Sequence, residues 1–288
     1  MRRIKYFQRK SPVESVIYCL VSLLFAIFAI SYLYILLWTL MSALKTHTEI
    51  VMDPFALPAK LNWDHFIEVT KLLEVNGQGF WRMLFNSTYF SVLGAFLTQF
   101  ITAFFAYACT KYKFPGCEIP YLIILITMTL PIYGAGGATY KLYRDLGLVD
   151  SYAHIICNLG GMNANFLYYR AFFKNVSNTY AEAAQMDGAG HFTTYFRVIF
   201  PQAKPIFGAL FLTTWLGSWN TYESALIYLP NLPTLPVGLF QFNTEMIYRA
   251  RLDILFAGCF IAAIPALVLF VGFNKVITTN VSLGGIKG

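Results

Sequence analysis

The amino-acid sequence predicts an all-α integral membrane protein with six transmembrane helices. Of its 288 residues, 57% are hydrophobic and only 12% are charged, whereas a soluble domain carries about 25% charged residues. The hydrophobic residues gather in charge-free runs, and about 20 apolar residues suffice for an α-helix to cross a bilayer. These two observations exclude an ordinary soluble domain.

Six charge-free windows supply the expected helices: 15–44, 83–110, 119–140, 151–169, 205–222 and 254–274. The first is longer than the 7–15 apolar residues of a secretory signal, so it is predicted to be a transmembrane helix. The fourth is the weakest, because polar residues such as His154, Asn158 and Asn163 interrupt it. Such a segment is expected to face neighbouring protein or a wet cavity rather than lipid.

The basic residues predict the orientation. With six helices, the segments on one side hold 13 of the 21 Lys and Arg residues: Arg2, Arg3, Lys5, Arg9, Lys10, Lys111, Lys113, Arg170, Lys174, Arg197, Lys204, Lys275 and Lys287. The positive-inside rule places this side in the cytoplasm, together with both chain ends. The net charge of +7 is therefore a topology signal, and no nucleic-acid partner is predicted.

We expect three parts along the chain. Residues 1–14 form a cytoplasmic N-terminal segment, 15–277 a single transmembrane domain, and 278–288 a cytoplasmic tail. Inside the domain, residues 176–204 form a large cytoplasmic loop. On the opposite side, residues 230–252 form an outward loop stiffened by three prolines, which meets an extracellular partner or is an ordinary connector.

The loop between the fourth and fifth windows is polar and rich in small residues. It reads EAAQMDGAGHFTTYFRVIFPQAKP from Glu182 to Pro205. Thr179 and Glu182 have the spacing of a capping box, which predicts a helix beginning at Tyr180. Gly188 is the expected left-handed residue that ends this helix.

A second helix is expected to follow in the same loop. It would carry Phe192, Phe196, Ile199 and Phe200 on one face. Pro201 and Pro205 are expected to end it before the next membrane span.

The segment EAA, then DGA, then an apolar helix ending in Phe-Pro resembles the cytoplasmic signature loop of binding-protein-dependent ABC importer permeases. The resemblance implies the type I ABC importer permease fold, in which the first loop helix is a coupling helix that docks on an ATPase subunit. On that resemblance, the docking residues are Glu182, Ala183, Ala184, Asp187, Gly188 and Ala189. Glu182 would supply an ion pair, and the small residues the fit.

Other residues are similar to the carbohydrate branch of these permeases. Trp219-Asn220, Tyr222 and the run Leu235 to Leu239 match its pattern, and Leu146-Gly147-Leu148 and Gly284 to Gly288 also look like it. Two positions depart from the family pattern: Ser177 stands where a proline is common, and Phe200 where a leucine is usual.

Four residues near the end of the fifth window are candidates for the substrate pathway: Trp219, Asn220, Tyr222 and Glu223. Aromatic faces stack on sugar rings, and amide or carboxylate groups bind hydroxyls. The alternative is that the aromatic residues belong to the interfacial belt of a membrane protein.

The resemblance implies a subunit that works with partners. These are a second homologous permease subunit, two ABC ATPase subunits, an extracellular solute-binding protein, membrane lipid and a carbohydrate substrate. The expected location is the bacterial cytoplasmic membrane, and the expected mechanism is alternating access.

The chain is not expected to be an enzyme or to bind a cofactor of its own. It lacks the phosphate-binding motif G-x-x-x-x-G-K-[ST], so ATP and magnesium would be bound by the ATPase subunits. Its five cysteines form no CxxC pair, and no metal site is predicted. Two alternatives stay open: the same scaffold importing a polyol, glycerol phosphate or peptide, and a stand-alone secondary transporter.

Overall fold

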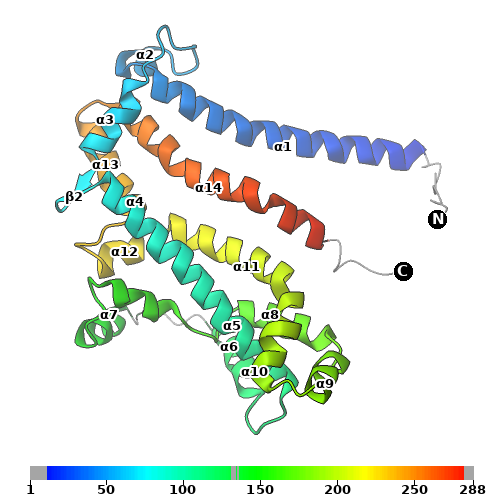
Figure 1. The fold of residues 1–288 in the computed structure, drawn as a ribbon. Coiled ribbons are helices and arrows are strands. Elements are labelled where there is room, and N and C mark those ends of the chain that lie inside the picture. Colours follow the sequence, from blue (N-terminus) through cyan, green and yellow to red (C-terminus); the bar gives the residue numbers. More distant parts are fainter. Residues whose placement is uncertain (1–11, 131–133, 135, 282–288) are drawn as a thin grey trace. The chain divides into compact units, whose positions relative to one another are not determined.

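The computed structural model describes residues 12–130, 134 and 136–281, and it is mostly helical there (Figure 1). Contacts divide the chain into two compact units. The first combines Met1–Val69 with Met246–Ile261, and the second combines Thr70–Glu245 with Ala262–Gly288. The predicted end segments 1–14 and 278–288 lie largely outside the described residues, and the boundaries of the predicted domain 15–277 remain a prediction.

The first unit begins with one long apolar helix. Helix α1 runs over Pro12–Leu44, and its side chains are exposed along most of its length. The short helix α2 (His47–Met52) follows it with a capping box of its own. There the Thr46 hydroxyl accepts from the Glu49 N–H, and the Glu49 carboxylate accepts from the Thr46 N–H at 2.8 Å. That backbone hydrogen bond lowers the pKa of Glu49.

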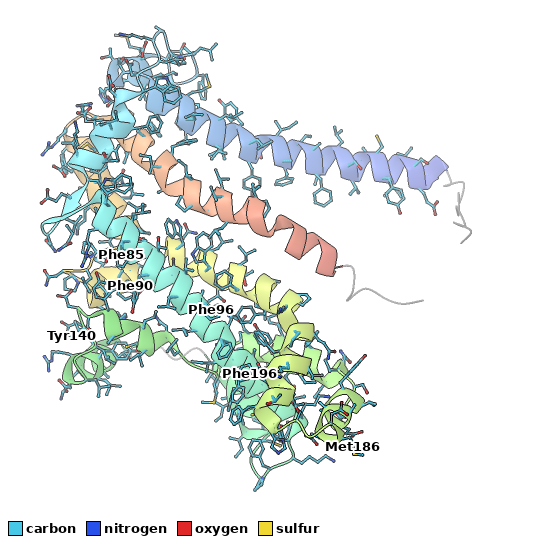
Figure 2. The ribbon with its side chains drawn as sticks, viewed as in Figure 1. Phe85, Phe90, Phe96, Tyr140, Met186 and Phe196 are labelled. Atoms are coloured by element: carbon cyan, nitrogen blue, oxygen red, sulfur yellow. The ribbon has the colours of Figure 1, made fainter. Side chains whose placement is uncertain are left out.

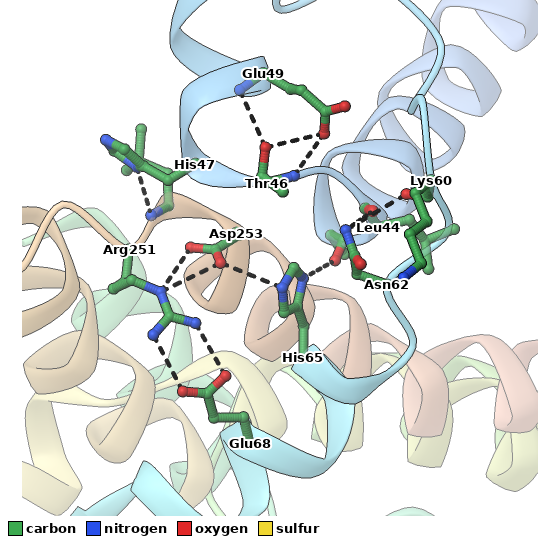
Figure 3. A network of polar contacts seen from close by, with 12 residues as sticks. Leu44, Thr46, His47, Glu49, Lys60, Asn62, His65, Glu68, Arg251 and Asp253 are labelled. Carbon is green, nitrogen blue, oxygen red and sulfur yellow. Dashed lines mark hydrogen bonds and ion pairs between the residues drawn. The ribbon is translucent and has the colours of Figure 1, made fainter.

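A charged network holds this unit together at one end (Figure 3). Arg251 donates to both carboxylate oxygens of Glu68, at 3.1 and 2.9 Å, and its Nε donates to Asp253 at 3.2 Å. His65 lies between Asp253 (3.3 Å) and the carbonyl of Ala43 (2.8 Å). The network therefore joins the end of α1, helix α3 (Asp64–Leu72) and the start of α14 (Leu252–Val281).

Replacing Arg251 by methionine is expected to destabilise the protein by about 1–3 kcal/mol. The change leaves the buried Asp253 carboxylate without its guanidinium partner, and hydrogen bonds to charged groups contribute about that much. Arg144→Met is the matched control, because the Arg144–Asp145 pair is exposed and should contribute less than about 1 kcal/mol. Thermal unfolding of the two purified variants measures the difference, and equal midpoints would contradict the structural role of the network.

The second unit is built around one nearly continuous helix. It consists of α4 (Phe80–Thr88), a π-helical turn η1 (Tyr89–Leu93) and α5 (Gly94–Lys111). Helices α8 (Asn165–Asn175) and α11 (Phe200–Asn220) pack against α5, as Figure 1 shows. A short β-hairpin precedes α4. Its two strands have two residues each, and β1 (Glu74–Val75) pairs antiparallel with β2 (Gln78–Gly79).

The core of the second unit lies between α5, α6, α8 and the start of α11. Its buried members combine small residues, among them Ala103 and Ala106 on α5, with large aromatic rings on α5, α8 and η3 that fill the space beside them. They are Ala103, Ala106, Tyr107, Cys109, Ile124, Phe166, Tyr169, Phe173, Tyr195, Ile199 and Ala203.

Three helices in the described ranges are long and apolar enough to cross a membrane: Val13–Leu44, Phe80–Lys111 and Leu252–Gly272. They coincide with the predicted windows 15–44, 83–110 and 254–274. The window 205–222 is also helical, because α11 covers it as far as Asn220.

The windows 119–140 and 151–169 are not the single helices that the sequence predicted. Helix α6 (Ile119–Thr129) stops before Leu130, whose backbone is extended, and α7 runs over Gly136–Asp145. The reason is Pro131, which disfavours the helical conformation in the residue before it. In the second window, a 3₁₀-helix η2 (Tyr152–Asn158) is followed by non-helical backbone until α8.

The segment expected as an outward loop over 230–252 is mostly helical. Helix α13 covers Leu235–Tyr248 after the short helix α12 (Glu223–Tyr228). The prolines before it are anchored, because Asn76 donates to the Pro230 carbonyl at 2.9 Å and Asn86 to the Pro233 carbonyl at 3.0 Å. Residues 230–233 are therefore anchored within the second unit.

Candidate functional site

The loop predicted to carry the docking residues contains a short exposed helix. Helix α9 spans Thr179–Met186, beside α10 (His191–Thr194) and the π-helical turn η3 (Tyr195–Ile199). It has two sides. Ala181, Ala184 and Ala189 are half-buried, and Ala181 packs against the core of the second unit.

The other side of α9 is open. Of the predicted docking residues, Glu182, Ala183, Asp187 and Gly188 are exposed. Met186 is 88% exposed, and Figure 2 shows it at the outer edge of the helix. Ala181 therefore attaches the helix to the core of the second unit, while the exposed residues are free to meet a partner.

The end of α9 is a Schellman motif. Gly188 adopts φ +81°, as predicted for a left-handed stop. The Ala189 N–H donates to the Ala184 carbonyl at 2.9 Å, and the Gly188 N–H donates to the Gln185 carbonyl at 3.0 Å. A side chain at position 188 would meet no atom within 4 Å, so the turn demands glycine for its backbone conformation and not for space.

The start of α9 differs from the predicted capping box. The helix begins one residue earlier, at Thr179, with Asn178 as its N-cap and no side-chain cap hydrogen bond. The Ser177 hydroxyl instead accepts from the Thr179 N–H at 3.2 Å. The capping box was expected to place the Glu182 carboxylate on the Thr179 N–H. The hydroxyl of Ser177, a position where proline is common in the family pattern, accepts from that N–H instead.

Lys111, the last residue of α5, and Tyr112, the residue after it, bond to the chain on either side of α9. The Lys111 ammonium donates to the Val176 carbonyl at 2.5 Å and to Asn178 at 2.8 Å, just before α9. Tyr112 is hydrogen-bonded to His191 at 3.0 Å, just after it. Both sides of α9 are thus bonded to residues at one end of a membrane-length helix that is packed in the core.

A basic cavity of about 460 Å³ lies beside the start of α9. Lys111, Lys113 and Lys174 line it, and Glu182 is the acidic residue among its lining. Of the four charged side chains in this lining, three are therefore positive and one is negative.

The second loop helix is longer than predicted. From His191 the chain stays helical through α10, η3 and α11 to Asn220, so Pro201 and Pro205 do not end it. Pro201 lies in the first turn of α11 and Pro205 inside it, and both stand in helical backbone. The π-helical turn η3 changes which residues of this helix face the core, and Ile199 is buried there.

The aromatic face expected on this helix is present in part. Phe192 stacks on Phe104, and Phe196 stacks on Phe100, with ring centroids 6.1 and 5.9 Å apart. Phe200 meets Phe100 edge to face at 5.9 Å. These contacts tie the segment after α9 to α5.

The four predicted pathway residues do not form one open surface. Trp219 is 4% exposed, and its indole donates to the Ala262 carbonyl at 3.4 Å. The Tyr222 ring stacks on Phe240 with a centroid distance of 4.6 Å. Asn220 and Glu223 are exposed. In this conformation both aromatic rings contact the chain itself, so their role as sugar platforms stays a prediction.

Sequence reasoning missed several residues that shape these regions. Lys111 counted only as a topology signal, and nothing singled out Tyr112 or His191. The sequence did hold a signal for them. Lys111 and Tyr112 are polar residues directly after the second apolar window, and His191 is a polar residue directly after the glycines of the loop.

The chain was compared with known protein families and structures. Residues 115–282 match the model of the family described as "Binding-protein-dependent transport system inner membrane component". The arabinooligosaccharides transport system permease protein AraQ of Bacillus subtilis (strain 168) is 28% identical over 285 residues, which is 97% of this chain and 99% of that protein. The diacetylchitobiose uptake system permease protein NgcG of Streptomyces coelicolor is 26% identical, over 86% of this chain and 82% of that protein.

Two further comparisons extend these. The sn-glycerol-3-phosphate transport system permease protein UgpE of Escherichia coli O1:K1 is 31% identical, over 69% of this chain and 73% of that protein. A crystal structure of a bacterial ABC transporter involved in the import of the acidic polysaccharide alginate has a chain with the same fold, with a TM-score of 0.74, 23% identity, and coverage of 92% of this chain and 98% of that one. The chain therefore belongs to the family of binding-protein-dependent transport system inner membrane components, and it is a transport permease rather than an enzyme.

Proposed function

We propose that this chain is one of two permease subunits of a bacterial carbohydrate ABC importer. It would form half of the pathway for a sugar or oligosaccharide that an extracellular solute-binding protein delivers. The family match supports an importer of this class, and the named substrates of the relatives AraQ and NgcG support a carbohydrate.

The observation that carries the proposal is the fixing of α9 at both ends. The outer side of this short helix is open, and Lys111 and Tyr112 hold the chain on either side of it. Such a helix is suited to transmit the movement of a docked partner to α5. Glu182, Ala183, Asp187 and Gly188 would contact the ATPase subunit, and Ala184 and Ala189 would support them from behind. ATP and magnesium would be held by the ATPase subunits, and this chain would need no cofactor.

The proposed topology has six spans, with both chain ends and residues 176–204 in the cytoplasm. The contacts in the second unit agree with it, because Lys111, at one end of the helix Phe80–Lys111, meets Val176. Near the other end of that helix, Asn76 meets Pro230, and Asp150 accepts from Asn231 at 2.8 Å. Segments assigned to the same side thus lie together. The interrupted segments 119–145 and 151–175 would cross the membrane at places where other parts of the protein cover their irregular backbone.

Transport would follow alternating access. ATP binding shifts the equilibrium only if the ATPase dimer favours one permease conformation, and the docked helix α9 would carry that difference. Glycerol phosphate is the second candidate substrate, because a relative of 31% identity is named for it. A stand-alone secondary transporter is not supported, since the family takes its name from dependence on a binding protein.

The test is reconstitution of the chain with its partner permease, ATPase and binding protein in lipid vesicles. We expect ATP-dependent uptake of a neutral oligosaccharide that requires the binding protein. A thiol reagent should label a cysteine at the exposed Asn178 only from the cytoplasmic side. Labelling from outside in intact cells would overturn the topology, and ATP-independent uptake by the chain alone would overturn the importer assignment.

A further inference from the structure

We propose that a polar cavity in the second unit is a binding site for an uncharged part of the transported carbohydrate. The cavity has a volume of about 340 Å³, which falls in the range of ligand sites. It lies against the junction of α11 and α12 and is distinct from the aromatic rings of Trp219 and Tyr222. This inference rests on the proposed function and adds the class of substrate.

The lining residues have the chemistry of hydroxyl recognition. Six carry a hydroxyl, amide or imidazole group: His154, Asn158, Ser218, Thr221, Ser224 and Thr234. Hydroxyl and amide groups both donate and accept hydrogen bonds, as sugar hydroxyls do. Phe90 supplies an aromatic wall; it packs against α12, and Figure 2 shows it on the helix that contains η1.

One buried polar atom in this lining has no hydrogen-bond partner in the described part of the chain. Thr234 is 7% exposed, and its hydroxyl is buried without a hydrogen bond. A buried hydroxyl in that condition costs about 1–3 kcal/mol unless something binds it. The backbone around it is fixed, because the Leu235 N–H donates to Ser87 at 2.6 Å and the Gly238 N–H donates to the Thr234 carbonyl at 2.9 Å. In this conformation the hydroxyl is held in place but covered by neighbouring atoms, so a ligand reaches it only after those atoms shift.

His154 is a second polar residue of the lining whose position is fixed. Its Nδ1 lies 3.1 Å from the Leu148 carbonyl, which only accepts, so Nδ1 carries the proton. In the neutral ring, Nε2 is then left as an acceptor. Stacking on Tyr228, with ring centroids 5.3 Å apart, fixes the ring plane.

Irregular helices make the wall that these groups occupy. Phe90 lies in the π-helical turn η1, Asn158 ends the 3₁₀-helix η2, and Thr221 follows the last residue of α11. In a membrane protein, such backbone is tolerated where it is buried in protein or lines a cavity. Two of the polar residues that interrupt the window 151–169, His154 and Asn158, thus line this cavity.

The charge of the lining selects the ligand class. None of the described residues that line the cavity is Asp, Glu, Lys or Arg. A phosphate or carboxylate placed here would lose its hydration without an opposite charge, which is costly. The cavity therefore favours a neutral sugar unit over glycerol phosphate or a uronate.

The test uses the complete transporter with Ser218→Cys in a chain whose native cysteines are replaced. A small thiol reagent is applied with neutral probes (arabino-oligosaccharides or diacetylchitobiose) or with charged probes (glycerol 3-phosphate or oligoalginate). We expect neutral probes to slow modification at least threefold and charged probes to have no effect. Equal protection by charged probes, or no protection by any neutral probe, would overturn the inference.

Two variants give an independent measurement. Thr234→Val should leave the unfolding temperature unchanged or raise it, since it removes an unsatisfied hydroxyl, and should raise the KM for neutral sugar about three- to tenfold. Gly217→Leu should abolish uptake, because a side chain there points into open space that belongs to the cavity. Thr213→Leu, on an exposed position of the same helix, should transport like the wild type.

The outcomes separate this inference from the proposed function. Protection by neutral sugars without ATP-driven uptake by the wild type would overturn the importer and keep the cavity. Uptake by the wild type with an unchanged KM in Thr234→Val and normal uptake by Gly217→Leu would keep the importer and overturn the cavity.

Discussion

Glu182→Lys is expected to abolish ATP-driven uptake while the chain still inserts in the membrane. Glu182 lies on the open side of α9 and is the acidic residue in the lining of a cavity that holds Lys111, Lys113 and Lys174. Reversing its charge makes all four charged side chains of that lining positive. It also puts a cation in the first turn of a helix, which the helix dipole disfavours.

The magnitude follows from the loss of a charge pair at an interface. Removing one partner of such a pair costs about 2 kcal/mol or more, so the affinity for the ATPase subunit should fall roughly 30-fold. Pull-down of the ATPase and sugar-stimulated ATP hydrolysis measure it. Asp145→Lys is the matched control, because it makes the same charge change at an exposed residue of α7. Equal ATPase binding by both variants would limit Glu182 to a role in the helix itself.

The long apolar helices could be predicted from sequence because one property decides them. A charge-free run of membrane length has few other stable states, and Val13–Leu44, Phe80–Lys111 and Leu252–Gly272 follow that rule. The two failed windows are those in which a competing local preference acts. Pro131 prevents the residue before it from staying helical, and the polar and glycine residues after Asn158 leave the backbone irregular as far as α8.

Local turn chemistry was predicted in part. Gly188 was assigned a left-handed turn because few other residues adopt that conformation cheaply, and its φ of +81° agrees. The capping box failed because two side chains compete for the same N–H, and Ser177 bonds the Thr179 N–H in place of the expected pair. Spacing alone does not tell whether the Ser177 hydroxyl or the Glu182 carboxylate accepts from that N–H.

The candidate sites depend on contacts between distant residues, which a single sequence does not reveal. Lys111 and Val176 are 65 residues apart, and Thr234 approaches His154 only because the chain folds back. The sequence pointed to Trp219 as a sugar platform from its type and position near the end of a helix. It could not reveal that the indole is buried against Ala262.

Gly188→Trp is expected to abolish coupled transport because position 188 has a left-handed backbone conformation. Gly190→Trp adds the same side chain where the backbone is ordinary, so it separates backbone strain from side-chain size. Gly188 has φ +81°, whereas Gly190 has φ −70°, a conformation that any residue adopts. Neither position has an atom within 4 Å of an added Cβ, so neither substitution is opposed by a local clash at that carbon. The difference between them is the left-handed backbone, which costs a residue with a side chain about 1–2 kcal/mol.

That strain acts on the hydrogen bonds that end α9. If residue 188 leaves the left-handed region, the bonds from the N–H groups of residues 188 and 189 to Gln185 and Ala184 are lost together. The outer side of the helix would then no longer be presented in one geometry. Gly188→Ala should reduce sugar-stimulated ATP hydrolysis about 5- to 30-fold, the factor that 1–2 kcal/mol corresponds to, while Gly190→Ala should stay within twofold of the wild type. Similar losses in Gly188→Ala and Gly190→Ala would mean that the partner senses the size of this loop, and equal activity of both with the wild type would mean that the turn at Gly188 does not position the docking surface.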